Sequence, residues 1–569
     1  MQHFLLVYLY VILSVSTYAQ QFSQLDEHFI DSFMNANYKT GEPGAVIMIA
    51  KNGRTVFKKG YGLANLELNV SNKPDYVFRI GSMSKQFTAI CVLKLAQDGK
   101  LNLQDDIRKY LPNYNTHGRD ITIANLLSHT SGIRNINEVK NFPEIAVSNQ
   151  SPHELLNYFM NDSLAFEPGT DWKYSNSNYM IAGLIVEKVS GLSLSEFLQR
   201  NIFNPLGMTH TCVGNYDRII KNAVNGYDRA LEKDNFKPAI YMGWIYTFGH
   251  GNITSNLHDL LKWDNALYTD KIIKSEWLKK AWTPFELTDG RIAHYGFGWS
   301  INNFHGIKLI EHDGGINGFS SDGIRVPSKK LYIVILSNKP STDQDRIAQS
   351  ITVRLAGLKL TLPSHKSFNK NINEYSGVYA LHADGLKNVG DSIDKTQYRY
   401  FTSKHDTLFT QTTGIIRDTV FFASKDLFIH KNGHLLYQFH RNTEDKIVSV
   451  EIYYELIQYG INEVNFKTAL SLQLPEEKHA IILNINQLNL LTGKYDFGGG
   501  LVLPVTTDGT KIYFQLPGKD KEEMFAKDEL NFFFKTSDAT IEFVGDKGKI
   551  KSMIAKLGGE IHEAKKIDE

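Results

Sequence analysis

Residues 77–95 read VFRIGSMSKQFTAICVLKL, a stretch that joins two reactive side chains to the start of a helix. Ser82 and Lys85 stand three positions apart, and the apolar Phe87, Ile90 and Leu95 follow at helical spacing. Residues i and i+3 of a helix share one face, and the N-terminal end of its dipole favours negative charge on the serine oxygen. The stretch therefore predicts a nucleophile beside a proton acceptor near a helix N-terminus.

A serine hydroxyl is a poor nucleophile at neutral pH, and a lysine kept neutral by desolvation or a phenolate can activate it. The spacing alone is a weak signal, because Ser367 with Lys370 and Ser392 with Lys395 match it too. Those two pairs lie in polar stretches with no apolar helix after them. We interpret them as surface matches that carry no chemistry.

A second motif lies in residues 166–179, FEPGTDWKYSNSNY, which form a polar, turn-rich stretch before an apolar helix expected over 180–189. Such a loop presents side chains to a cleft, so Tyr174 and Asn176 are candidate site residues. Taken by itself, Tyr174 also fits a packed tyrosine. A third motif is His312-Asp313-Gly314-Gly315, whose glycine pair on its own indicates a tight turn.

In this order and spacing, the three motifs resemble those of the β-lactamase and penicillin-binding-protein superfamily, and most closely its class C branch. The resemblance covers residues 24–360 and extends to these further segments: Leu126-Leu127-Ser128-His129-Thr130-Ser131-Gly132, Asn204-Pro205-Leu206-Gly207-Met208, Tyr295-Gly296-Phe297-Gly298-Trp299 and Gly318-Phe319-Ser320-Ser321.

The resemblance implies that Ser82 is acylated, that Lys85 and Tyr174 shuttle the proton, and that Asn176 orients the substrate or Lys85. Which of Lys85 and Tyr174 is the base stays open. It also implies that the third motif lies in a strand beside the cleft, where the Gly315 amide faces the Ser82 amide as a second donor to the oxyanion. Glycines at 314 and 315 would then let the backbone approach the substrate closely.

The third motif departs from the family pattern, because His312 stands where relatives usually have lysine and Asp313 replaces a hydroxyl residue. A mostly neutral imidazole beside an aspartate is a poor receptor for a substrate carboxylate. The motif is similar to the D-aminopeptidase and esterase branches. The expected substrate is a small molecule or short peptide in which an amide or ester bond is cleaved. The group that flanks this bond should be neutral or cationic, and D-amino-acid peptides belong to this class. Asp313 could instead cap a turn or pair with His312.

Two classes of function follow. The first is an exported serine hydrolase that cleaves an amide or ester through an acyl-enzyme on Ser82, of D-aminopeptidase, D-peptidase or esterase type. The second is a catalytically silent, penicillin-recognising ligand-binding protein, and a true class C-like β-lactamase is a further alternative. Intact Ser82, Lys85 and Tyr174 favour the enzyme.

Composition sets outer bounds. A chain of 569 residues with 42% hydrophobic residues and a net charge of +1 is typical of a soluble multi-domain protein, and no charge excess indicates a nucleic-acid partner. The sequence has no zinc-protease motif and two cysteines, so we expect no metal and no cofactor. Whether Cys91 pairs with Cys212 in a disulfide stays open.

An apolar run over 4–13, followed by Thr17-Tyr18-Ala19, predicts a signal peptide. The mature chain should be periplasmic or secreted, without a transmembrane segment.

The predicted fold is α+β over residues 20–360, with an antiparallel sheet, helices packed on it and a helical insertion. A hairpin is expected at 45–57, with Asn52-Gly53 in its turn. After a signal peptide at 1–19 and a linker at 361–373, we expect small antiparallel β-barrels at 374–470 and 485–569. Tyr375 to Tyr379 resembles Leu491 to Tyr495, which indicates a divergent tandem repeat. The second copy resembles the lipocalin-like barrels appended to some hydrolases of this superfamily.

Overall fold

The computed structural model describes residues 23–139, 142–230, 235–304, 307–339, 344–357, 372–380, 398–404, 407–412, 418–430, 435–454, 463–467, 480–498, 501–516, 521–534, 539–546, 549–557 and 560–567. The signal peptide expected at 1–19 lies outside these residues, as do the pairs at Ser367 and Ser392 and the expected linker except for 372 and 373.

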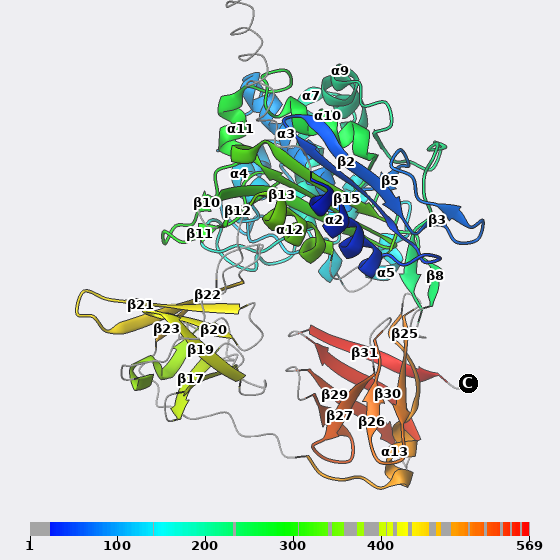
Figure 1. Cartoon of the computed structure of the whole chain (residues 1–569), viewed down its shortest axis with the longest axis vertical. Helices are drawn as coiled ribbons and strands as arrows, with labels where there is room; N and C mark the ends of the chain where they lie inside the picture. The colour runs from blue at the N-terminus through cyan, green and yellow to red at the C-terminus, as the bar shows by residue number, and fades with distance from the viewer. Residues whose placement is uncertain are drawn as a thin grey trace, which may run out of the picture.

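A six-stranded antiparallel sheet forms the centre of the first part of the chain (Figure 1). Its strand order is β12 (Ser300–Phe304), β13 (Ile307–Ile316), β14 (Phe319–Val326), β15 (Leu331–Ser337), β1 (Ala45–Lys51) and β2 (Arg54–Tyr61). The expected hairpin is confirmed, because Lys51 pairs with Arg54 across a turn in which Asn52 and Gly53 have φ of 52° and 74°. N-terminal and later strands therefore share one sheet.

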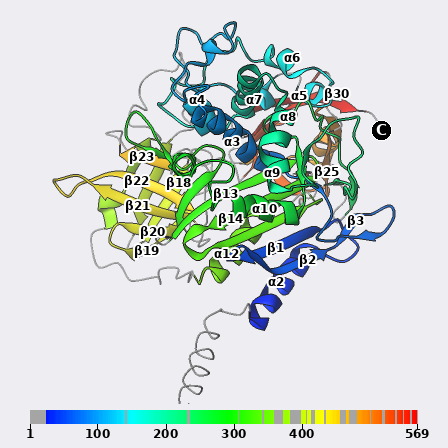
Figure 2. The ribbon, with the colours of Figure 1, turned by 90° about the horizontal axis from the view of Figure 1, so that it is seen from above.

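Successive side chains of a strand point to opposite faces of the sheet, so alternate residues belong to two different apolar cores. Ile47 and Ile49 of β1 pack with α2 (Gln24–Asn37) and α12 (Gln344–Leu355) in one core. Val46 and Met48 belong to the second core, with α3 (Ser84–Gln97) and the helical insertion. The sheet is thus a middle layer between two sets of helices, as Figure 2 shows from above.

Helix α3 is buried on all sides except at Lys94 and Gln97, more completely than its predicted apolar stripe requires. It lies between the sheet and a helical part of the domain that Figure 2 shows on one side of the strands. The helices there are α4 (Ile123–Ser128), α5 (Phe142–Ala146), α6 (Pro152–Leu156), α7 (Asn176–Ser190), α8 (Leu194–Leu198), α9 (Asn204–Leu206), α10 (Leu257–Ala266) and α11 (Ser275–Ala281). Smaller sheets join β5 (Phe78–Arg79), β9 (Ile253–Ser255) and β6 (Cys212–Val213), and β3 (Leu63–Asn65) with β4 (Val70–Ser71).

Beyond residue 372 the chain forms two closed eight-stranded barrels, drawn below the sheet domain in Figure 1. The first has strands β16 (Gly377–Ala380), β17 (Tyr398–Lys404), β18 (Thr407–Thr412), β19 (Asp418–Ser424), β20 (Leu427–His430), β21 (Leu435–Arg441), β22 (Ile447–Tyr454) and β23 (Glu463–Lys467). The second follows α13 (Ile485–Leu491) and has strands β24 (Gly493–Asp496), β25 (Val502–Thr507), β26 (Ile512–Phe514), β27 (Glu522–Ala526), β28 (Asn531–Phe533), β29 (Thr540–Asp546), β30 (Lys549–Leu557) and β31 (Glu560–Ile567).

The two barrels repeat the same contacts at equivalent positions. In the first barrel the Tyr379 hydroxyl donates to the Tyr375 carbonyl at 2.8 Å, and its ring lies 5.8 Å from Phe439. In the second the Tyr495 hydroxyl donates to the Leu491 carbonyl at 2.7 Å, and its ring lies 5.7 Å from Phe543.

The last strand of each barrel also repeats a lysine. Lys467 Nζ donates to the Glu374 carbonyl at 2.8 Å, and Lys566 Nζ donates to the Leu490 carbonyl at 3.0 Å. Each lysine also lies over the repeated tyrosine. These matched contacts support the tandem repeat read from the sequence.

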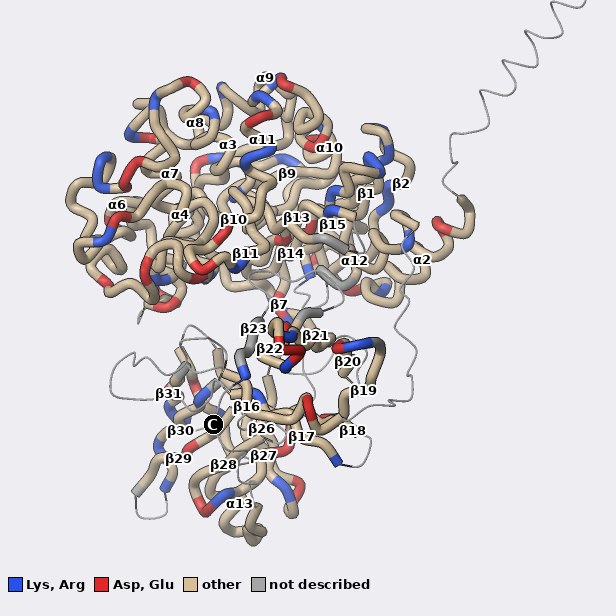
Figure 3. Tube along the Cα trace, turned by 90° about the vertical axis from the view of Figure 1, so that its left-hand side faces the viewer, with Lys and Arg blue, Asp and Glu red and all other residues tan. Residues whose placement is uncertain are grey.

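Acidic and basic side chains are interspersed over the described part of the chain (Figure 3). Among the helices of the described residues, none has the length and apolar character needed to cross a bilayer. Cys91 and Cys212 are both buried and both free, so the open question of their pairing is answered: they form no disulfide.

Candidate active site

Ser82 lies in a short 3-10 turn, Gly81–Met83, that leads directly into α3. Gly81 has a φ of 49°, which a residue with a side chain rarely adopts, and a Cβ there would lie 3.0 Å from the Gly315 amide nitrogen. The strand β13 therefore passes directly beside the turn that carries the serine. Ser82 itself is half-buried, whereas its neighbours in α3 are buried.

Lys85 is fully buried, and its Nζ lies 3.0 Å from Ser82 Oγ. The same nitrogen is 2.8 Å from Asn176 Oδ1 and 3.1 Å from the His250 carbonyl oxygen, two atoms that only accept. A neutral amine in this position would donate its two N–H groups to these oxygens and turn its lone pair to the serine hydroxyl. Burial lowers the pKa of Lys85 well below its ordinary value, and the charge of Asp313 offsets part of this shift.

Tyr174 lies two residues before α7, half-buried, with its ring centroid 4.7 Å from Lys85 Nζ. Burial raises the pKa of Tyr174 well above its ordinary value, the Asp313 charge adds to the rise, and a hydrogen bond with Ser82 offsets part of it. The phenol is therefore protonated at neutral pH. Burial thus moves the pKa values of Lys85 and Tyr174 in opposite directions.

Asn176 is the first residue of α7, and it connects the site to two residues that sequence reasoning missed. Its Nδ2 donates to Asn137 Oδ1 at 3.3 Å, and the Tyr246 hydroxyl donates to the same oxygen at 2.5 Å. Asn137 and Tyr246 come from separate loops and match no motif. No pattern in the sequence could have found this contact.

The two glycines of the third motif have different surroundings. A Cβ at Gly314 would lie 2.1 Å from the Ile80 carbonyl oxygen and 2.4 Å from Ser321 Oγ, whereas a Cβ at Gly315 would meet nothing within 4 Å. The need for glycine at 314 therefore comes from packing against the turn that carries Ser82, not from a substrate. At 315 the protein itself places no steric demand on the side chain.

His312 is fully buried, and its ring faces Tyr295 rather than open solvent. Its Nδ1 lies 2.6 Å from the Asp313 carbonyl oxygen, which only accepts, so Nδ1 carries the hydrogen. The Tyr295 hydroxyl therefore donates to Nε2, at 2.8 Å. Burial, with a contribution from Lys85, lowers the pKa of His312 to about 3, which fits the neutral imidazole expected from the sequence.

His129 belongs to a cluster of aromatic rings beside the site, with its ring centroid 4.4 Å from that of Tyr174 and 4.8 Å from that of Tyr295. The residue ends α4 with a φ of 62°, and its Nδ1 accepts from the Ser175 amide at 3.3 Å. Burial lowers its pKa well below the ordinary value. The segment around His129 matches the family pattern, but nothing in it indicated contact with Tyr174.

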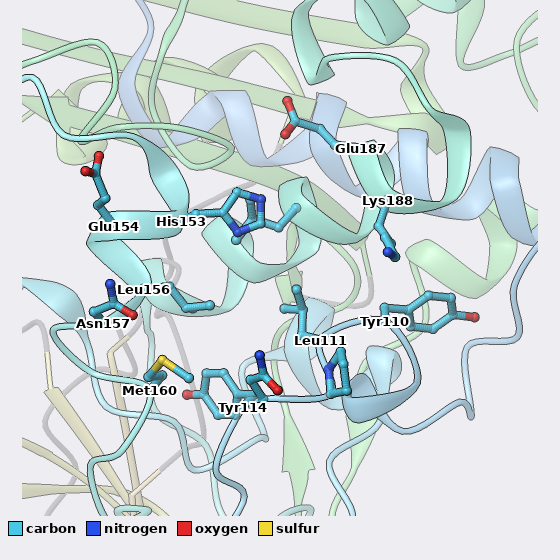
Figure 4. Close-up of a pocket in the computed structure, with 13 residues that line it drawn as sticks. Tyr110, Leu111, Tyr114, His153, Glu154, Leu156, Asn157, Met160, Glu187 and Lys188 are labelled. Atoms are coloured by element: carbon cyan, nitrogen blue, oxygen red, sulfur yellow. The ribbon is translucent and has the colours of Figure 1, made fainter.

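A surface groove of about 680 Å³ lies elsewhere in the domain, between α6, α7 and the loop at 110–114 (Figure 4). It is lined by Tyr110, Tyr114, His153 and Lys188 among others. It contains none of the residues of the three motifs. In the part of the chain that the structure describes, no group of three or more His, Cys, Asp or Glu side chains is arranged to hold a metal ion.

Comparison with known proteins identifies the family. A penicillin-binding protein of Bacillus subtilis is 28% identical over 410 residues, which cover 67% of this chain and 86% of that protein. The octameric penicillin-binding protein homologue from Pyrococcus abyssi, 24% identical, superposes with a TM-score of 0.53 over 77% of this chain and 98% of that one. A D-stereospecific amidohydrolase from Streptomyces, also 24% identical, has a TM-score of 0.50 over 58% of this chain and 98% of that one. The family model described as Beta-lactamase matches residues 20–358, and the chain therefore belongs to the β-lactamase family.

Proposed function

We propose that this member of the β-lactamase family is an exported serine hydrolase that cleaves an amide or ester through an acyl-enzyme on Ser82. The observation that carries the proposal is the environment of Lys85. Its amine is buried and 3.0 Å from Ser82 Oγ, and its two other partners are both acceptors. A neutral lysine in that position is a general base aimed at the serine proton.

Acylation would begin when Ser82 Oγ attacks the carbonyl carbon and its proton passes to Lys85 Nζ. The oxyanion would accept from the amides of Ser82 and Gly315, which belong to the turn and the strand that lie side by side. Collapse breaks the bond to the leaving group, which takes the Tyr174 phenol proton, and Lys85 returns its proton to Tyr174. Water then attacks the acyl carbon, gives a proton to the same pair, and Ser82 leaves with its hydroxyl restored.

Asn176 would hold Lys85 in place in this scheme, because its Oδ1 accepts from Nζ at 2.8 Å. His312 and Asp313 stand where relatives carry a lysine and a hydroxyl residue, so the site has no buried cation to receive a substrate carboxylate. This supports a D-aminopeptidase or esterase type of substrate over a β-lactam. The signal peptide predicted at 1–19 supports export to the periplasm or the medium.

The alternative is a silent ligand-binding protein, and covalent labelling separates it from the enzyme. A fluorophosphonate probe should add its mass to the wild-type chain and fail to add to Ser82→Ala, measured by intact mass. The matched control is Ser84→Ala, because Ser84 Oγ is buried and accepts from the Ile253 amide at 3.2 Å. That variant should still be labelled.

Turnover of a nitrophenyl ester, a D-alanyl anilide and a chromogenic cephalosporin should follow the labelling. We expect hydrolysis of the ester or the anilide, and little of the cephalosporin. A folded wild-type chain that gains no mass and turns over none of the three would refute the hydrolase. Rapid cephalosporin turnover would instead favour the β-lactamase.

A further inference from the structure

His129 holds the backbone on both sides of Tyr174. It lies at the end of α4, fully buried, with a φ of 62° in the left-handed region. Its main-chain carbonyl oxygen accepts from the Lys173 amide at 3.1 Å. Its ring Nδ1 accepts from the Ser175 amide at 3.3 Å. The two residues that flank Tyr174 in the chain are therefore both hydrogen-bonded to His129.

The tautomer of the His129 ring follows from its partners. The Ser175 amide can only donate, so Nδ1 carries the lone pair and Nε2 carries the hydrogen. Asn178 Nδ2 donates to the same lone pair at 3.2 Å, and this amide is oriented because its Oδ1 accepts from Ser131 Oγ at 2.7 Å. Burial lowers the pKa of His129 well below its ordinary value, which keeps the lone pair free of a proton.

The His129 ring also packs against the Tyr174 side chain. The two ring centroids lie 4.4 Å apart with an angle of 42° between the planes. The Tyr174 ring in turn lies 4.7 Å from Lys85 Nζ. Two backbone hydrogen bonds and one ring contact, all made by His129, thus fix the phenol relative to Lys85.

We propose that His129 is a positioning residue that holds Tyr174 where its phenol can protonate the leaving group. The inference rests on the proposed hydrolase function, in which Tyr174 is the acid of the acylation step. The Nδ1 lone pair acts through the Ser175 amide, and His129 itself takes no proton in the reaction. The cost of losing this lone pair should therefore depend on how much the leaving group needs a proton.

The test compares two esters of one acyl group, acetyl or D-alanyl, whichever the wild type turns over. A 4-nitrophenyl ester releases a phenolate that leaves without a proton, whereas a benzyl ester releases an alkoxide that needs one. In His129→Leu and His129→Gly, kcat/KM for the benzyl ester should fall about tenfold further than kcat/KM for the 4-nitrophenyl ester. Leucine keeps much of the bulk of the ring, and glycine adopts a positive φ without strain, so a folded form of either variant decides. Tyr174→Phe sets the size of the full effect.

His129→Asn is the conservative variant. Asparagine tolerates a positive φ, and its Oδ1 offers the Ser175 amide an acceptor in place of Nδ1, so the ratio of the two kcat/KM values should stay within about twofold of the wild type. The matched control is Thr130→Val, because Thr130 Oγ1 is buried in the same segment and accepts from Asn125 Nδ2 at 3.0 Å. That variant should lower the thermal midpoint and leave the ratio unchanged.

Equal losses on both esters in His129→Leu and His129→Gly would overturn the proposal, because a general structural defect does not distinguish the leaving groups. An unchanged ratio would overturn it too, and so would a fall in His129→Asn or Thr130→Val as large as in His129→Leu. Failure of the hydrolase itself looks different, because the wild type would then turn over no ester and Ser82 would take no label.

Discussion

At the scale of single residues, burial sets the charge states of Lys85 and Tyr174. Because burial lowers the pKa of Lys85 well below its ordinary value, kcat/KM for an uncharged ester should rise with pH and reach its plateau well below the pH at which an ordinary lysine loses its proton. Because the pKa of Tyr174 is raised, no alkaline decline should follow below about pH 10. His312, with its pKa lowered to about 3, should add no inflection at neutral pH. A pH–rate profile checks this, and a decline between about pH 7 and 9 would contradict the assignment of Lys85 as base.

The glycine pair gives a second prediction at this scale. A methyl group at 314 would lie 2.1 Å from the Ile80 carbonyl oxygen, so Gly314→Ala should displace the turn that carries Ser82 and abolish labelling. At 315 a methyl group meets nothing within 4 Å, so Gly315→Ala should keep the thermal midpoint of the wild type. Differential scanning calorimetry and intact mass test both variants. Equal behaviour of the two would contradict the packing argument.

At the scale of elements, Asn137 in the 3-10 turn Ile136–Glu138 accepts from Asn176 at the start of α7, and the Tyr246 hydroxyl holds the Asn137 side chain in place. Removing the donor in Tyr246→Phe leaves Asn137 with Asn176 alone, and kcat should fall several-fold, because Asn176 then positions Lys85 less well. The stability cost should be about 1 kcal/mol. Tyr110→Phe is the matched control, since that hydroxyl donates to Asp105 at 2.5 Å far from the site, and only its stability should change. Equal kcat losses in both variants would contradict a positioning role for Tyr246.

Sequence patterns predicted elements well where one strong local signal was present, and poorly where it was absent. The hairpin at 45–57 and the helix after Ser82 carried apolar periodicity and a turn dipeptide. The strand β14 (Phe319–Val326) was not predicted, because Ser320, Ser321 and Asp322 interrupt its apolar pattern although all three are buried. The site was predicted as motifs, but the contact of Asn137 with Tyr246 joins loops about a hundred residues apart, and no local pattern encodes it.

At the scale of the whole molecule, the sheet domain and each of the two barrels have apolar clusters of their own that share no residues. The sheet domain has its own clusters up to residue 356, the first barrel packs around Tyr379 and Phe439, and the second packs around Tyr495 and Phe543. Within the described residues, each barrel packs a cluster of buried apolar side chains, so we expect the barrels to support the fold rather than to hold a ligand inside. Independent cores predict independent unfolding transitions.

The first barrel, β16 to β23, offers a specific test of this independence. Arg441 is 13% exposed, and it donates to Asp426 from both Nε and Nη2 and to Glu374 from Nη1. Removing one partner of such a buried pair costs about 3–5 kcal/mol, so Arg441→Met should lower the midpoint of one calorimetric transition by several degrees. Lys446→Met removes an exposed pair with Glu444 and should shift nothing. Labelling of Ser82 should remain at the wild-type rate in both variants, because no atom of Arg441 belongs to the sheet domain's cores. If Arg441→Met lowered every transition together and slowed labelling, the barrel would be part of one cooperative unit with the hydrolase.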